Sequence, residues 1–247
     1  MRWLDELRLA VMFLTRLPCG SFNGAAPPLS AALWAFPLVG LITGAIGWGV
    51  HLLLTCLGAT PLLASSVALG ATTLATGALH HDGLADFADG IGGGRDRAHV
   101  LEIMRDSRIG SYGVLALLFA VALQISALAS FSGSIPLTAF LLIGAGSRLS
   151  MLGLLTLMPP ARAEGLGQNA RGGQNLKTAL PGAILTVLLA LFLCLAGLAA
   201  LAAMTLGAAL IARLAHRRLG GQTGDVLGAA QMVAATLGWI ALSLTLP

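Results

Sequence analysis

Three aspartates lie close together in the segment HHDGLADFADG, which occupies residues 80–90. Asp82, Asp86 and Asp89 follow a long stretch, 17–81, that contains no Asp, Glu, Lys or Arg. Their spacing of four and then three residues places all three on one face of a helix, because successive residues turn by about 100°. Oxygen-only ligands suit Mg²⁺, with Mn²⁺ as the alternative, better than Zn²⁺. The segment therefore predicts a metal site with these three aspartates as ligands.

A solvated loop is the alternative interpretation of this acidic segment. In that case the acids would pair with the arginines that follow them in the chain, Arg95, Arg97, Arg105 and Arg108. We favour the metal site because neighbouring carboxylates repel one another, and because charge beside hydrocarbon is costly unless a cation neutralises it.

A second segment, MRDSRIGSYG at 104–113, surrounds Asp106 and Ser107 with Arg105 and Arg108. Guanidinium groups can hold phosphate oxygens in a bidentate way, and Asp106 could join the metal ligands. Arginines that only anchor the chain at a membrane are the alternative, but such anchors would not explain Asp106.

A third segment, GGQTGDVLGA at 220–229, carries the lone acid Asp225. Its glycines, Gly220, Gly221 and Gly224, allow a phosphate to approach the backbone closely. Carboxylates, a metal ion and arginines at one site suit phosphoryl or nucleotidyl transfer with an anionic substrate.

The composition indicates what must position these segments. Of the 247 residues, 57% are hydrophobic and only 10% are charged, whereas soluble domains have about 25% charged residues. A bilayer core needs about 20 apolar residues for each helix. We therefore expect an all-α, polytopic membrane bundle, with the whole chain 1–247 as a single transmembrane catalytic domain.

The uncharged stretches predict about seven transmembrane helices. Turn residues divide them into spans near 31–57, 61–79, 110–129, 136–157 and 226–246, with a two-helix hairpin in 178–212 that turns near Gly197. One long span in place of the hairpin would give six. The segment 80–90 is expected to continue the second span as a helix.

Arginine bias predicts the orientation. The loops 80–109, 158–179 and 213–225 carry most of the basic residues, so we expect them and the N-terminus to face the cytoplasm, with Pro247 outside. The active site would then face the cytoplasm.

Residues 1–16 predict a retained amphipathic helix at the membrane interface, or else the start of a first span. The basic residues are dispersed over short loops and do not indicate nucleic-acid binding.

The strings TGALHHDGLADFADG, LEIMRDSRIGSYG and GGQTGDVLGA resemble the signature blocks of the adenosylcobinamide-GDP ribazoletransferase family, the integral-membrane cobalamin synthases. FLTRLP at 13–18 and FPLVGLITG at 36–44 resemble that family's N-terminal blocks. The resemblance implies a multi-pass enzyme of the bacterial inner membrane, in contact with lipid. It would join adenosylcobinamide-GDP to α-ribazole or its 5′-phosphate, release GMP and use Mg²⁺.

The same resemblance assigns roles to particular residues. The aspartate-rich motif would contain Asp82, Asp86 and Asp89 as catalytic metal ligands, and Asp106 and Asp225 would be further catalytic residues. The positions that would bind substrate are His80, Arg105, Ser107, Arg108, Thr223 and Gly224. The chain departs from the pattern at Ala235, where related sequences often carry glutamate, which puts a ligand role for that turn in doubt.

Two other kinds of protein also have acidic residues in an apolar chain. A CDP-alcohol phosphotransferase has a related Asp-rich helix, but that family carries Ala-Arg two residues after Asp-Gly, where this chain has Asp86-Phe87. A cation transporter prefers ionisable residues midway along its spans, and here only Arg148 lies there. Assembly of identical copies, or association with other enzymes of the pathway, is a further expectation about partners that the sequence leaves open.

Overall fold

The structure is a computed structural model that describes residues 2–22, 24–162 and 176–246. Throughout these ranges the regular elements are helices, and no named strand occurs. The all-α prediction is therefore confirmed. The helices are α1 (Arg2–Leu14), α2 (Leu29–Ala32), the 3-10 helix η1 (Leu33–Ala35), α3 (Phe36–Cys56), α4 (Pro61–Thr76), α5 (Leu79–Gly93), α6 (Arg97–Ile103), α7 (Ser111–Ala129), α8 (Leu137–Leu157), α10 (Leu176–Phe192), α11 (Cys194–Leu219) and α12 (Gly224–Thr245).

The long helices agree with the predicted membrane spans. Five helical segments in the described ranges are long and apolar enough to cross a membrane, namely Leu29–Cys56, α7, α8, α11 and α12. Counted as one broken span, the bent pair α4 and α5 is a sixth. The apolar helix α10 is shorter than these spans, and the described helices are roughly consistent with the expected number of about seven. Many large hydrophobic side chains on these helices are exposed, as a lipid-facing surface requires.

The stretch 178–212 forms two helices, but the break lies at Leu193 and not near Gly197 as predicted. Cys194 adopts a left-handed φ of 52°, which ends the first helix and starts the second. Gly197 is needed for packing, since a Cβ there would collide with the backbone of Ala190. The glycine therefore permits the two helices to approach each other, and the turn is made elsewhere.

The expectation that 80–90 continues the second span is wrong. The chain bends by 89° between α4 and α5. Gly77 and Ala78 are both left-handed, with φ of 61° and 57°, and this conformation cannot continue a right-handed helix. The acidic segment nevertheless forms its own helix, so the predicted spacing of the aspartates on a helical face is retained.

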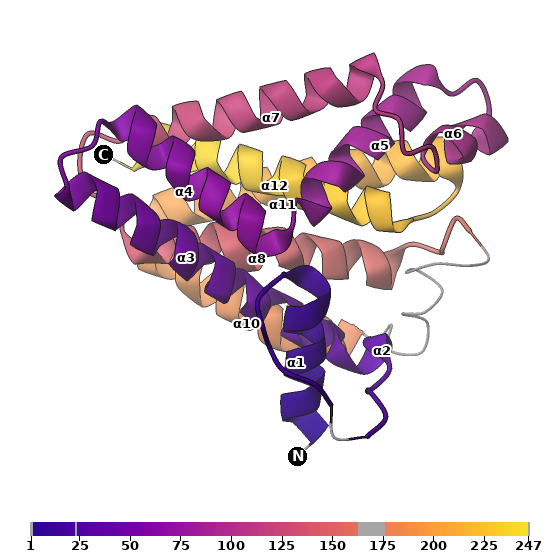
Figure 1. The fold of residues 1–247 in the computed structure, drawn as a ribbon, viewed down its shortest axis with the longest axis horizontal. Coiled ribbons are helices and arrows are strands. Elements are labelled where there is room, and N and C mark those ends of the chain that lie inside the picture. Colours follow the sequence, from indigo (N-terminus) through magenta and orange to yellow (C-terminus); the bar gives the residue numbers. More distant parts are fainter. Residues whose placement is uncertain (1, 23, 163–175, 247) are drawn as a thin grey trace.

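Close glycine contacts allow the helices of the bundle to approach one another. A Cβ on Gly40 would overlap the backbone of Gly144, and the reverse also holds, so α3 and α8 touch through their backbones. Figure 1 shows α12 running through the middle of the bundle, and it packs against α5, α7, α8 and α11. The beginnings of α7 and α12 lie at the same end of the bundle as α5 and α6, opposite the C-terminus (Figure 1).

Candidate active site

The crossing of α5 and α12 brings the first and third predicted motifs together. Gly83 makes this possible, because a Cβ at this position would lie 3.1 Å from the carbonyl oxygen of Asp225 and 3.1 Å from Cα of Gly228. Thr223 precedes α12 as its N-cap, accepting from the amide of Val226 and donating to Oδ2 of Asp225, each at 3.3 Å. The cap therefore orients Asp225 beside the start of α5.

Three carboxylates form what we call the acidic cluster: Asp82 and Asp86 of α5, and Asp225 of α12. The charges of Asp82 and Asp225 both act on Asp86, and Asp82 acts on Asp225. Asp82 is exposed and Asp86 is half-buried. Within the described ranges, neither of these two side chains accepts a hydrogen bond or forms an ion pair. Direct contacts with the described residues therefore do not compensate the repulsion between these two carboxylates.

Among the described residues, Arg162 is the basic residue that forms an ion pair with this cluster, and in the sequence its loop serves only to predict the orientation. Its Nη2 lies 3.8 Å from Oδ2 of Asp225, and its charge also acts on Asp86. A short backbone pairing carries it there: the amide of Ala161 donates to the carbonyl of Gln222 at 2.8 Å, next to Asp225. Burial is the main cause that lowers the pKa of the Arg162 guanidinium from its usual value. It remains a cation at neutral pH.

Asp89 lies on the same face of α5 but in a different environment. Its carboxylate is buried and accepts the amides of Gly110 and Gly113, each at 2.8 Å. These amides belong to the start of α7, where the first N–H groups of a helix have no partner within the helix. Asp89 therefore satisfies the N-terminus of α7, and its predicted role as a metal ligand is a separate matter that stays a prediction.

The second motif forms an exposed turn between α6 and α7. Arg108 donates through Nη2 to Oδ2 of Asp106 at 2.6 Å, and its backbone amide donates to Oδ1 at 3.0 Å. The hydrogen bonds from Arg108 lower the pKa of Asp106 to about 2, so this carboxylate is ionised at neutral pH. Ser107 and Arg105 are exposed. The charge of Arg105 acts on Arg162, which places it toward the acidic cluster.

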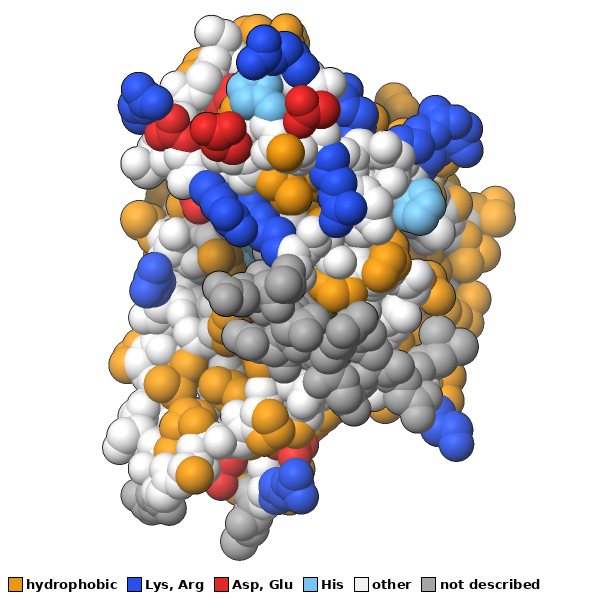
Figure 2. Space-filling model, turned by 90° about the vertical axis from the view of Figure 1, so that its right-hand side faces the viewer, with side chains coloured by type: hydrophobic (Ala, Val, Ile, Leu, Met, Phe, Trp, Pro, Cys, Tyr) orange, Lys and Arg blue, Asp and Glu red, His pale blue; other side chains and the backbone are white. Residues whose placement is uncertain are grey.

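Figure 2 looks onto this end of the molecule and shows acidic and basic side chains gathered in the upper part of the view, where Figure 1 places α5 and α6. Of the predicted substrate-binding residues, Thr223 is buried and Gly224 is exposed at the first position of α12. His80 is buried and lines a cavity inside the bundle, and its Nε2 has no hydrogen-bond partner in the described part of the chain. Ala235 lines the same cavity and lies away from the acidic cluster.

The carboxylate oxygens of Asp82 and Asp86 are suitable ligands for a hard divalent cation whose remaining ligands come from the substrate. Across the described residues, no three His, Cys, Asp or Glu side chains converge closely enough to form a complete metal site. Mg²⁺ is commonly held by only one or two carboxylates together with substrate phosphates and water. The partnerless oxygens of Asp82 and Asp86 match that arrangement.

The chain matches the cobalamin-5-phosphate synthase family over residues 6–243. Three similar proteins are each named adenosylcobinamide-GDP ribazoletransferase. The protein from Bradyrhizobium diazoefficiens is 45% identical over 92% of this chain and 88% of its own length. The one from Rhizobium etli is 44% identical over 91% and 90%, and the one from Mesorhizobium japonicum is 41% identical over 93% and 89%. No solved structure matches the chain. The match over nearly the whole length means that the chain belongs to the cobalamin-5-phosphate synthase family.

Proposed function

We propose that this protein joins adenosylcobinamide-GDP to α-ribazole or α-ribazole 5′-phosphate, in the final stage of cobalamin synthesis. The product is adenosylcobalamin or its 5′-phosphate, and GMP is released. Family membership and the names of the relatives support this reaction. The observation that carries it is the acidic cluster at one end of a membrane bundle, where Arg162 pairs with Asp225, and where Asp82 and Asp86 have no hydrogen-bond or ion-pair partner among the described residues.

In the proposed reaction, a ribose hydroxyl oxygen forms a bond to the phosphorus on the cobinamide side of the diphosphate. The bond from that phosphorus to the oxygen of GMP breaks, and GMP leaves with the electron pair. The hydroxyl proton passes to a base, for which the carboxylates of the acidic cluster are the nearest candidates. The protein's main task is then to hold two anionic substrates in line.

We assign Mg²⁺, or Mn²⁺, to Asp82 and Asp86, with Asp225 as a third carboxylate within electrostatic reach. A cation bound there would neutralise charge on the diphosphate and on the departing GMP. Asp82 and Asp86 also repel a diphosphate when no cation is present, so binding of substrate and metal should be mutually dependent. Titration of turnover with metal in the presence of a chelator tests this assignment.

The basic residues around the cluster are assigned to the diphosphate. Arg162 is held by Asp225 and by the carbonyl of Leu101, which its Nη2 reaches at 3.3 Å. Arg105 is exposed and its charge acts on Arg162. Two neighbouring guanidinium groups repel each other, and a phosphate between them removes that repulsion. The exposed amide at Gly224 adds a donor at the N-terminus of α12.

We further propose that the chain lies in a bacterial inner membrane with this end facing the cytoplasm. The arginine-rich loops between the helices support that orientation. Reporter fusions test it: a reporter active in the periplasm should work after Leu193 and after Pro247, and a reporter active in the cytoplasm should work after Gly94. Cytoplasmic activity after Pro247 would reverse the assignment.

The activity is tested with the full chain reconstituted in liposomes. Release of GMP from adenosylcobinamide-GDP should require α-ribazole or its 5′-phosphate and should stop when divalent metal is chelated. Cation flux across the same liposomes should not exceed that of liposomes without protein. Flux without GMP release would favour a transporter. GMP release that does not depend on the α-ribazole acceptor would contradict the proposed transfer.

A further inference from the structure

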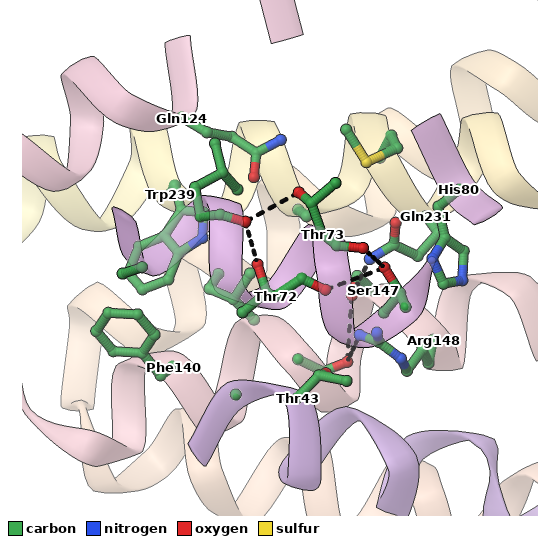
Figure 3. Close-up of a pocket in the computed structure, with 18 of the residues that line it drawn as sticks. Thr43, Thr72, Thr73, His80, Gln124, Phe140, Ser147, Arg148, Gln231 and Trp239 are labelled. Atoms are coloured by element: carbon green, nitrogen blue, oxygen red, sulfur yellow. Dashed lines mark hydrogen bonds between the residues drawn. The ribbon is translucent and has the colours of Figure 1, made fainter. Parts of the chain in front are cut away.

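A second polar region lies inside the bundle, away from the acidic cluster. It is a cavity of about 80 Å³ bounded by α3, α4, α5, α7, α8 and α12. Figure 3 shows His80, Ser147, Arg148 and Gln231 gathered at one end of it, with the aromatic side chains of Phe140 and Trp239 at the other. We refer to the end lined by those four polar residues as the basic end of the cavity.

Arg148 brings a cation into this interior. The residue is 4% exposed, and its Nη1 donates to the carbonyl of Gly144, one turn earlier in α8, at 3.1 Å. Its Nε is buried and has no hydrogen-bond partner among the residues that the structure describes. Within the described part of the chain, no carboxylate forms an ion pair with it. A buried guanidinium without a counter-charge costs several kcal/mol, so the cavity favours an anion beside it.

The neighbouring polar groups indicate which hydrogen bonds that anion must donate and accept. Gln231 donates through Nε2 to the hydroxyl of Ser147 at 3.0 Å, which leaves its buried Oε1 without a donor. Nε2 of His80 is also buried without a partner. A ligand that satisfies these groups must accept a hydrogen bond from Arg148 and donate one to Oε1 of Gln231. Hydrogen phosphate can do both, whereas sulfate carries no donor.

The size of the cavity agrees with such a ligand. One water molecule needs roughly 10–15 Å³ of this kind of volume, so a cavity of about 80 Å³ has room for roughly five to eight water-sized atoms. A tetrahedral oxyanion is an ion of that size. A nucleotide or a corrinoid is far larger and could place only a phosphate group there.

The cavity and the acidic cluster lie on different faces of α5. His80 and Asp82 are two residues apart, which separates their directions by about 200° around the helix. The charged or titratable groups that act on His80 are Arg148 and His81, and no carboxylate in the described ranges is among them. An anion at the basic end is therefore shielded from the repulsion of the aspartates.

We propose that the basic end of this cavity is a phosphate-binding site, occupied by hydrogen phosphate or by the phosphate group of a substrate, with Arg148 as its charge partner and Gln231 as its acceptor. The site is separate from the acidic cluster. Binding of inorganic phosphate there is independent of the reaction proposed above, and only occupancy by a substrate's phosphate rests on that proposed function. This site would place a buried anion inside a bundle whose acidic cluster is also proposed to bind phosphate groups.

Equilibrium binding of radiolabelled inorganic phosphate to the full chain in lipid nanodiscs tests the proposal. The wild type should bind phosphate, and unlabelled phosphate should displace the label better than sulfate does. Arg148→Met should weaken binding by at least about 30-fold, because truncation of one partner of a buried charge pair costs about 2 kcal/mol or more. Arg213→Met, which removes an exposed arginine of α11, should bind as the wild type does.

A second variant keeps the test decisive if Arg148→Met does not fold. Gln231→Glu places a carboxylate beside Arg148 as a built-in counter-charge, so it should fold and lose phosphate binding. Competition with α-ribazole 5′-phosphate separates the two sources: displacement assigns the site to the substrate's phosphate, and no displacement assigns it to inorganic phosphate. Absence of binding to the wild type, or equal binding by wild type and Gln231→Glu, would overturn the proposal.

Discussion

The beginning and the end of α5 carry the same residue type on the same helical face and use it differently. At the beginning, Asp82 and Asp86 have no partner within the described ranges and are repelled by each other and by Asp225. At the end, Asp89 is buried and its two oxygens accept two backbone amides of α7. A carboxylate with satisfied oxygens stabilises the fold, whereas one without partners retains its capacity for a cation or a proton.

The second motif repeats this contrast with arginines. Arg108 is occupied by Asp106 through both its side chain and its backbone. Arg105 is exposed and lies within electrostatic range of Arg162. Residue type and spacing suggest the same role for Arg105 and Arg108. Their contacts in the structure indicate different roles. The partnerless residues of each motif are therefore the ones that we assign to chemistry.

The largest expected effect follows removal of charge at the beginning of α5. Asp82→Asn and Asp86→Asn should each lower turnover by at least about 100-fold, because loss of cation-borne charge stabilisation is worth several kcal/mol. GMP release in liposomes measures it. Glu102→Gln, which neutralises an exposed acid on α6, is the matched control and should be near wild type. Near-normal turnover in both aspartate variants would remove the metal assignment.

The arginines should differ in the same way. Arg105→Lys keeps the charge but loses the bidentate fork, and should lower kcat/KM by about 10- to 100-fold, or about 1.4–2.7 kcal/mol of transition-state binding. Arg108→Lys should cost less, because Arg108 is already paired with Asp106. Arg217→Lys serves as a topology control. Equal losses at 105 and 108 would mean that pairing with Asp106 does not decide the role.

At the end of α5 the expected effect is on stability. Asp89→Ala removes the acceptor for two amides at the start of α7 and should lower the free energy of unfolding by about 2 kcal/mol. Asp82→Ala should leave stability unchanged or raise it, since it relieves repulsion. Unfolding in mixed detergent micelles measures both. If Asp82→Ala were the more destabilising of the two, the contrast between the two ends of α5 would be wrong.

The smallest effect concerns pH. The pKa of Asp106 is lowered from 3.8 to about 2 by Arg108. A depressed pKa contributes stability that is present above pH 4 and is lost as the pH falls through about 2. The turn should therefore be insensitive to pH above 4. Titration of the Asp106 carboxyl carbon by NMR should give a midpoint near 2 that rises toward 3.8 in Arg108→Gln. An unchanged midpoint in that variant would show that another group holds the carboxylate ionised.

The sequence was sufficient for features that depend on local pattern. Hydropathy located the spans, and the spacing of Asp82 and Asp86 survived the bend before α5 because the helix restarts at Leu79. The bend itself depends on two successive left-handed residues, and the second of them is an alanine, which carries no sequence signal for that conformation. The break at Leu193 likewise depends on how α10 and α11 pack.

Contacts between distant segments could not be predicted in this way. Arg162 reaches Asp225 because Ala161 pairs with Gln222 across a separation of about 60 residues. The role of Asp89 depends on where α7 begins relative to α5. The basic end of the cavity combines residues of α5, α8 and α12; His80 and Arg148 stand out in their own segments, but no local pattern predicts that they meet Ser147 and Gln231.

The bond between Asp89 and Gly110 spans 21 positions of the chain, and it closes the segment that carries α6 and the second motif into a ring. For a chain of that length, the entropy lost on closure grows only slowly with the number of residues enclosed. The connection at 94–96, which joins α5 to α6, is therefore the part of this ring where an inserted residue should cost least, whereas an insertion within α6 would displace the buried Val100 and the Leu101 carbonyl that holds Arg162. Natural variation in length should accordingly be tolerated at this connection more readily than between Asp82 and Asp89, where one added residue would turn the aspartates onto different faces of α5.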